Sequence, residues 1–170
     1  PDINASDLAA IIVTTFFDEY GHDNDRAHSA VDAEELDARL VPALTRMAQL
    51  LRANASSYHD EIKLARDNAQ TYSTLDYIDL GNLTEHLLRT IPLNETELRK
   101  AIIEVRETIT TSVLAEDHGI GRNGSTGLTF YFPRYGVAWS YAKIQMSIEG
   151  RWDEFLDAYF DKRDRPNEAP

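Results

Sequence analysis

One short aromatic segment places the strongest constraint on how this chain folds. Residues 128–133, with the sequence Leu-Thr-Phe-Tyr-Phe-Pro, form the densest apolar and aromatic run of the chain. Glycine and serine residues precede the run between Gly119 and Gly127, and Pro133 ends it. A short aromatic run with turn-forming residues on both sides is typical of a buried strand. We therefore expect a strand here. Residues 112–115 are either a short strand, which would form a small hairpin with it, or the end of the preceding helix.

The other segments repeat their apolar residues at intervals of three and four, which is the spacing of one helix face. The first five repeats each follow a residue type that commonly caps a helix; the predicted N-caps are Asn4, Asp32, Ser57 (or Ser56), Asp79 and Asn94. The stripes that we expect to be buried are Leu8, Ile11, Ile12, Thr15, Phe16 and Tyr20; Leu36, Leu40, Leu44, Met47, Ala48 and Leu51; Tyr58, Ile62, Ala65 and Ala69; Leu80, Leu83, Leu87 and Leu88; Leu98, Ile102, Val105 and Ile109; and Trp152, Phe155, Leu156 and Tyr159.

These patterns predict a mainly α fold with a small β element (α+β), a bundle of about six helices packed around the strand at 128–133. Residues 21–29 are polar and charged, which predicts an exposed loop after the first helix. Pro42 lies inside a continuing apolar stripe, so we expect it to kink its helix. The last helix is expected at about 148–162. We predict a single domain over residues 1–163 and a frayed tail over 164–170.

Composition excludes several classes of site and partner. The 170 residues carry a net charge of −12, and a surface of this sign is repelled by nucleic acid. There is no cysteine, so these residues hold no disulfide, thiolate metal site or cysteine nucleophile. No apolar run approaches the length that spans a membrane, and we expect no membrane insertion.

Four local patterns partly match the signatures of functional sites. The glycines from Gly119 to Gly124 satisfy G-x-G-x-x-G, but a strand is expected after them where a dinucleotide site needs a helix. Ser125 lacks the frame of a nucleophile elbow, so a Ser125–His118 hydrolase is disfavoured. The stretch from Asp23 to Glu34 lacks the central glycine of a calcium loop, and no histidine has metal-ligand spacing. We therefore assign no catalytic, cofactor-binding or metal-binding residue and expect no cofactor.

The asparagines suggest a compartment. Five of the eight asparagines stand in Asn-x-Ser/Thr, at Asn4, Asn54, Asn82, Asn94 and Asn123. Helix capping and turns account for some of these positions, because both favour Asn followed by Ser or Thr. An exported or cell-surface protein, with glycosylation at these sites, is one interpretation that the sequence leaves open.

Several segments, taken in order, resemble the C-terminal part of the clostripain-like cysteine peptidases. The most specific are the Tyr-Phe-Pro strand and the Trp-x-x-Phe-Leu segment near the end of the chain. The residues that carry the resemblance are Asp7-Leu8-Ala9 through Phe16 and Tyr20, Ser29-Ala30-Val31-Asp32, Tyr77-Ile78-Asp79-Leu80 with Leu83, Gly127-Leu128-Thr129-Phe130-Tyr131-Phe132-Pro133, and Trp152 with Phe155-Leu156 and Tyr159. Together they span nearly the whole chain, from Asp7 to Tyr159.

The resemblance implies an endopeptidase, commonly cleaving after basic residues, with a His and Cys pair on a caspase-like sheet. In such a pair the imidazole favours the thiolate that attacks the scissile carbonyl. Those residues would precede this segment, and His118-Gly119 comes too late in the order to be the catalytic His-Gly. The implied role is a non-catalytic structural or interaction domain that contacts the catalytic domain of the same protein, and protein substrates through it. The alternative is a stand-alone binding module that shares the domain without peptidase activity.

Overall fold

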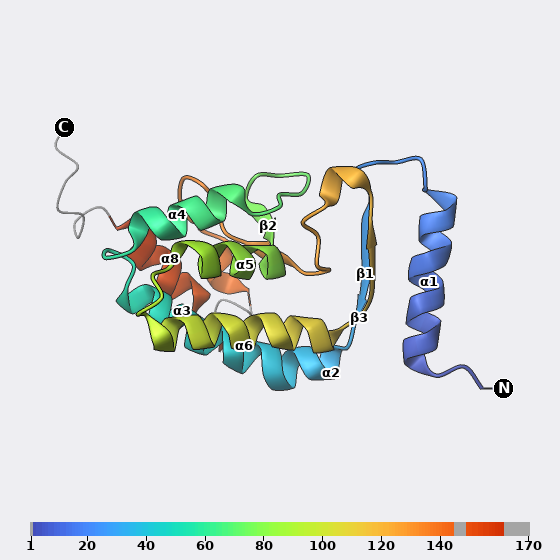
Figure 1. The fold of residues 1–170 in the computed structure, drawn as a ribbon, viewed down its shortest axis with the longest axis horizontal. Helices are drawn as coiled ribbons and strands as arrows, with labels where there is room; N and C mark the ends of the chain where they lie inside the picture. Colours follow the sequence, from blue (N-terminus) through green and yellow to red (C-terminus); the bar gives the residue numbers. More distant parts are fainter. Residues whose placement is uncertain (1, 145–148, 162–170) are drawn as a thin grey trace.

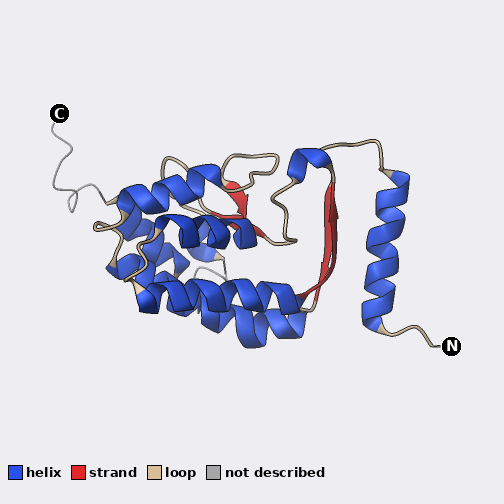
Figure 2. Cartoon of the chain, viewed as in Figure 1, coloured by secondary structure: helices blue, strands red, loops and turns tan. Residues whose placement is uncertain are grey.

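The computed structural model describes residues 2–144 and 149–161, and within them the predicted class is confirmed: the fold is mainly helical with two small sheets (Figures 1 and 2). In chain order the elements are α1 (Ala5–Glu19), β1 (Ala27–Val31), α2 (Ala33–Glu35), a π-helical turn (Leu36–Leu40), α3 (Val41–Ala53), α4 (His59–Asn68), β2 (Tyr77–Asp79), α5 (Leu80–Thr90), α6 (Thr96–Ser112), β3 (Val113–His118), a 3-10 turn (Ile120–Arg122), β4 (Thr129–Tyr131), a second 3-10 turn (Tyr141–Lys143) and α8 (Trp152–Phe160). The predicted tail at 164–170, and the outermost residues of the predicted last helix, lie outside the described residues.

Helices α3, α4, α5, α6 and α8 form the bundle, and the aromatic strand lies in its core. Phe130, Tyr131 and Phe132 are buried, and the Trp152 indole donates a hydrogen bond to the Tyr131 carbonyl at 2.9 Å. The Phe132 ring meets Phe155 edge to face, with 5.6 Å between the ring centroids. Most of the stripes predicted for the bundle helices are buried as expected. The periodicity of the sequence therefore identified the core-facing side of these helices correctly.

The predicted hairpin between 112–115 and 128–133 is wrong. β4 pairs with β2, and β3 pairs with β1, in two separate antiparallel two-stranded sheets. Residues 27–31 form β1, the strand that pairs with β3. The prediction of an exposed loop over residues 21–29 is therefore wrong for residues 27–29. Both pairings join segments that lie far apart in the chain, and a turn signal between two neighbouring strands carries no information about such partners.

Helix capping follows the sequence at three of the five predicted positions. The side chains of Asn4, Asp32 and Asp79 each accept a hydrogen bond from a backbone N–H of the first turn of the helix that follows. Glu95 takes the N-cap position of α6 in place of Asn94, and Tyr58 that of α4 in place of a serine, without side-chain caps. The observed N-caps thus lie one residue after the predicted Ser57 and Asn94.

The helix continues through Pro42 as expected, with an irregular turn beside the proline. Pro42 lies at the start of α3, but the π-helical turn precedes it without a break, so its missing N–H removes one backbone hydrogen bond from a continuous helical run. The π-helical turn stands immediately before it, and the Val41 N–H reaches back five residues to the Leu36 carbonyl. The irregularity near Pro42 is therefore a local widening of the helix.

Helix α1 overturns the prediction for the first apolar stripe. It stands apart from the bundle and packs on the ribbon of β1 and β3 (Figure 1). Val13 is its only buried residue, while the side chains of Leu8, Ile11 and Ile12 are 49%, 50% and 51% exposed. The contact with the ribbon is made by Phe16, whose ring stacks on His28 with 4.4 Å between the centroids. The stripe is present as predicted, but Leu8, Ile11, Ile12 and Tyr20 stay exposed while Phe16 packs on the ribbon.

The far end of the ribbon is closed by two chain segments that dock backbone to backbone. The Gly119 N–H donates to the Arg26 carbonyl at 2.9 Å, and the Gly121 N–H donates to the Asn24 carbonyl at 2.8 Å. A Cβ atom added to Gly119 would stand 2.3 Å from the Asn24 carbonyl oxygen. The glycines of this segment therefore allow a close backbone contact and do not serve a nucleotide.

We expect Gly119→Ala to lower the free energy of unfolding by about 2 kcal/mol, because the new methyl group meets backbone atoms that must shift to admit it. Urea denaturation followed by circular dichroism measures the change. Ile120→Ala is the control, since this neighbouring side chain is exposed and its loss should change stability by less than about 0.5 kcal/mol. Equal stability of Gly119→Ala and the unmodified chain would contradict the close contact.

Candidate functional site

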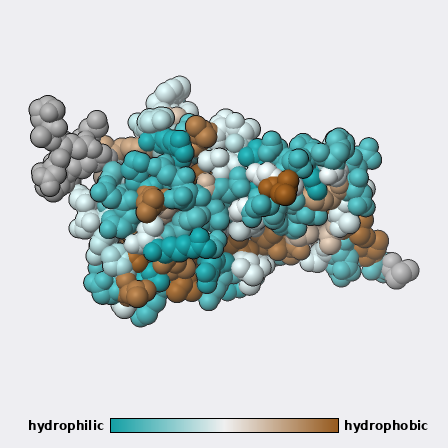
Figure 3. Space-filling view, turned by 45° about the horizontal axis from the view of Figure 1, so that its top comes forward, coloured by the Kyte–Doolittle hydropathy of each residue, from teal (hydrophilic) through white to brown (hydrophobic). Residues whose placement is uncertain are grey.

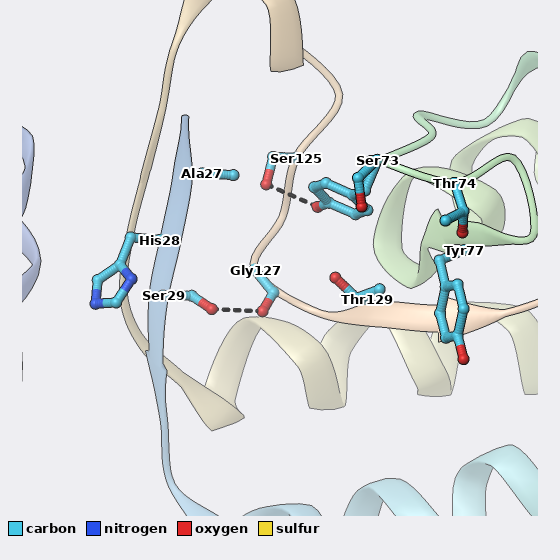
Figure 4. A pocket seen from close by; sticks show the side chains of 10 residues that line it. Ala27, His28, Ser29, Ser73, Thr74, Tyr77, Ser125, Gly127 and Thr129 are labelled. Carbon is cyan, nitrogen blue, oxygen red and sulfur yellow. Dashed lines mark hydrogen bonds between the residues drawn. The ribbon is translucent and has the colours of Figure 1, made fainter. Parts of the chain in front are cut away.

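A cavity lies between the ribbon and the bundle. It has a volume of about 470 Å³ and is lined by Ala27, His28 and Ser29 of β1, Tyr72, Ser73, Thr74 and Tyr77, and Ser125, Gly127 and Thr129. Figure 4 shows Ala27 and Ser29 on the cavity side of β1, with the His28 ring on the opposite side, toward α1. Hydroxyl groups dominate the walls. We name this cavity the hydroxyl groove.

A buried carboxylate, that of Asp79, lies behind the wall of the hydroxyl groove and accepts a hydrogen bond from the lining residue Tyr72. Asp79 has no exposed surface, and its two carboxylate oxygens accept four hydrogen bonds. The donors are the Asn82 N–H at 2.9 Å, the Tyr72 hydroxyl at 2.9 Å, the Thr126 N–H at 2.7 Å and the Thr126 hydroxyl at 2.6 Å. One side chain therefore caps α5 and also ties the segment before β4 and the segment before β2 to that helix.

The protonation of Tyr72 follows from this arrangement. Burial is the main cause that raises the pKa of Tyr72 far above its ordinary value, and the Asp79 carboxylate raises the pKa further. The phenol therefore stays protonated and donates to Asp79. Its oxygen lies 3.0 Å from the Ser125 hydroxyl, which must then supply the proton of that contact. A phenol held in this form cannot act as the base that would activate Ser125 as a nucleophile.

The structure gives Ser125 and His118 different partners. The Ser125 hydroxyl bonds to Tyr72, whereas the His118 ring, on β3, lies 2.9 Å from the Glu116 carboxylate. The arrangement lacks the hydrogen bond between nucleophile and base that a Ser–His hydrolase needs. The G-x-G-x-x-G segment forms a three-residue 3-10 turn and offers no helix N-terminus to a pyrophosphate.

The aspartates of the loop that begins at Asp23 are engaged in contacts within the protein. The Asp23 carboxylate accepts from the Asp25 N–H at 2.8 Å, and the Asp25 carboxylate lies 3.6 Å from the Arg122 guanidinium. Within residues 2–144 and 149–161, no three His, Asp or Glu side chains are grouped to hold a metal ion. None of the helices in this part of the chain is long and apolar enough to cross a membrane.

A second buried polar centre, at Arg66, was missed by sequence reasoning. Arg66 of α4 is 2% exposed, and its guanidinium donates to the Phe132 carbonyl at 3.0 Å and to the Leu75 carbonyl. Burial, and then the neighbouring Arg134 guanidinium, lower the pKa of Arg66. Arg66 stands one position after Ala65 of the predicted apolar stripe, and a charged residue beside a stripe gives no sequence signal that it is buried.

The five Asn-x-Ser/Thr asparagines differ in their surroundings. The side-chain amides of Asn4, Asn54 and Asn82 are hydrogen-bonded within the fold, to the Asp7 carboxylate, the Leu50 carbonyl and the Gln70 N–H respectively. Asn94 and Asn123 are exposed. Export and glycosylation remain a prediction from the sequence.

Comparison with known proteins gave no match: no protein-family model, no curated protein and no solved structure is significantly similar to this chain.

Proposed function

We propose that this chain is a non-catalytic structural and interaction domain of a clostripain-like cysteine endopeptidase, which packs against the catalytic domain of the same protein. The observation that carries the proposal is α1, a helix that is apolar on two sides. Its first side packs on the ribbon, and its second side is exposed. The order of the sequence segments supports the family, and the absence of cysteine means that the catalytic nucleophile would belong to the partner domain.

The exposed side of α1 has the character of a contact surface. Leu8, Ile11 and Ile12 lie at helical spacing, and each is half exposed. Figure 3 shows apolar surface gathered at the end of the molecule near the N-terminus. Covering the exposed half of each side chain would contribute about 1 kcal/mol per residue. An apolar patch on a helix that already covers a sheet with its other face is typical of an element held between two packed layers.

The ribbon of β1 and β3 also supports contact with a catalytic domain. Among the described residues β1 and β3 pair only with each other, so each strand has an outer edge without a ladder partner. Isolated two-stranded sheets are marginally stable, and open edges readily take a further strand. With α1 on one face and the Gly127 segment against the other, the ribbon is suited to continue a larger sheet. A caspase-like catalytic sheet is the partner that the resemblance implies.

The first test is to read the coding sequence upstream of Pro1 and to co-express its product with this chain. A strand-rich segment that carries a His-Gly and a later Cys should co-purify with the chain and should show thiol-dependent peptidase activity. An upstream segment with that pair that fails to associate with this chain would contradict the proposal, as would an upstream sequence without the pair.

The same pair of proteins tests the α1 surface. We expect Ile11→Lys with Ile12→Lys to weaken association at least about tenfold, because two ammonium groups would replace apolar contacts. Isothermal titration calorimetry measures the dissociation constant. Leu64→Lys on α4 is the matched control, since Leu64 is equally exposed at 55% but lies on the bundle, away from α1. Equal losses in both variants would show that α1 is not the contact surface.

A further inference from the structure

We propose that the hydroxyl groove is a binding site for a neutral carbohydrate, a role separate from the docking surface of α1. The inference rests on which groups line the cavity, where their protons are directed and which charges are kept away from it (Figure 4).

The protons of two groove hydroxyls are used inside the protein. The Ser29 hydroxyl donates to the Gly127 carbonyl at 2.7 Å, because a carbonyl can only accept. The Ser125 hydroxyl donates to Tyr72, because the Tyr72 proton is directed to Asp79. Both serine oxygens therefore keep lone pairs that can accept hydrogen bonds from a ligand. The groove is prepared for a ligand that donates from several positions, as the hydroxyls of a sugar do.

Ionised side chains are held outside the groove. Among the described residues that line it there is no Asp, Glu, Lys or Arg. Arg122, whose guanidinium carbon stands 5.9 Å from the centre of the Tyr72 ring, donates instead to the Thr71 carbonyl at 2.9 Å and the Asp25 carbonyl at 3.2 Å. Glu116 is engaged with His118. The net charge of the chain, −12, further disfavours an anionic ligand.

The rim supplies an apolar surface of the kind that sugars use. Tyr77 lines the groove and is 45% exposed, and its ring meets Tyr131 edge to face at 5.5 Å between the centroids. This contact holds the ring in place, while its exposed part can contact the C–H face of a pyranose. Ser73, Thr74 and Thr129 add hydroxyls that both donate and accept. A volume of about 470 Å³ is within the range of small-molecule sites.

The experiment is a titration of the isotope-labelled chain, observed by ¹H–¹⁵N NMR, with maltose and N,N′-diacetylchitobiose as neutral probes and glucuronic acid as the anionic probe. We expect at least one neutral disaccharide to produce saturable shifts at the amides of Ala27, Ser29, Thr74 and Tyr77. Glucuronic acid should bind at least about tenfold more weakly. Shifts that stay linear with concentration, or that scatter outside the groove, would overturn the proposal.

Substitutions in the groove test whether the sugar binds there. Ser125→Ala removes an acceptor, and Tyr77→Thr removes the ring while keeping a β-forming residue; each should raise the dissociation constant by about threefold to tenfold. Ser57→Ala, an exposed hydroxyl on the bundle, is the matched control and should leave it unchanged. Thermal melts establish that each variant is folded. Unchanged affinity in both folded groove variants would overturn the assignment, as would tighter binding of the uncharged dipeptide amide Ac-Ala-Ala-NH₂ than of either sugar.

Discussion

Asp79→Ala will lower the free energy of unfolding by about 4 kcal/mol, the largest effect expected from a single substitution in this chain. The substitution leaves four donors without their acceptor, from Asn82, Tyr72 and both groups of Thr126. These donors lie in a region where burial limits replacement by water. The loss of stability therefore has two parts: the lost capping energy of α5, and the cost of leaving the remaining donors without a partner.

Asp32→Ala is the matched control, because Asp32 is also an aspartate N-cap but is only partly buried. Its loss should cost about 1 kcal/mol, as an ordinary cap does. Urea denaturation of both variants, monitored by circular dichroism, gives the two values. If Asp79→Ala costs no more than Asp32→Ala, the Asp79 network contributes nothing beyond capping, and the ordered hydroxyls of the groove lose their support.

Arg66→Met will lower the free energy of unfolding by about 3 kcal/mol. The methionine fills much of the same volume but leaves the Phe132 and Leu75 carbonyls without their donor. It also removes a positive charge 3.8 Å from the Asp67 carboxylate. Loss of the hydrogen bond to the Phe132 carbonyl should also disturb the packing of the aromatic core, because Phe132 directly follows β4.

The near-ultraviolet circular dichroism of Arg66→Met should therefore weaken together with the loss in urea stability, because Phe132 packs against Trp152 and Tyr159. Arg46→Met, an exposed arginine on α3 in an ion pair with Glu97, is the control and should change stability by less than about 0.5 kcal/mol. Similar values for the two variants would mean that the buried guanidinium is replaceable by apolar packing, as happens for some buried ion pairs.

Much of the bundle was predictable because helices are local structures. The stripes of α3, α5, α6 and α8 follow from a spacing of three and four residues, and Asp79 was predicted correctly as a cap. What the cap also does was not predictable, because Tyr72 and Thr126 reach it from segments 7 and 47 residues away. The hydroxyl groove shares this origin: its walls come from three separate parts of the chain, and isolated serines and threonines give no pattern.

The sequence by itself determined the helical class, the core-facing side of the bundle helices and the buried aromatic strand, since each depends on periodicity or on a short run of residues. The strand partners, the burial of Arg66 and the exposure of the α1 stripe became visible only in the folded molecule. Strand pairing and burial depend on which distant segments meet, and an apolar stripe is the same in sequence whether or not a partner covers it.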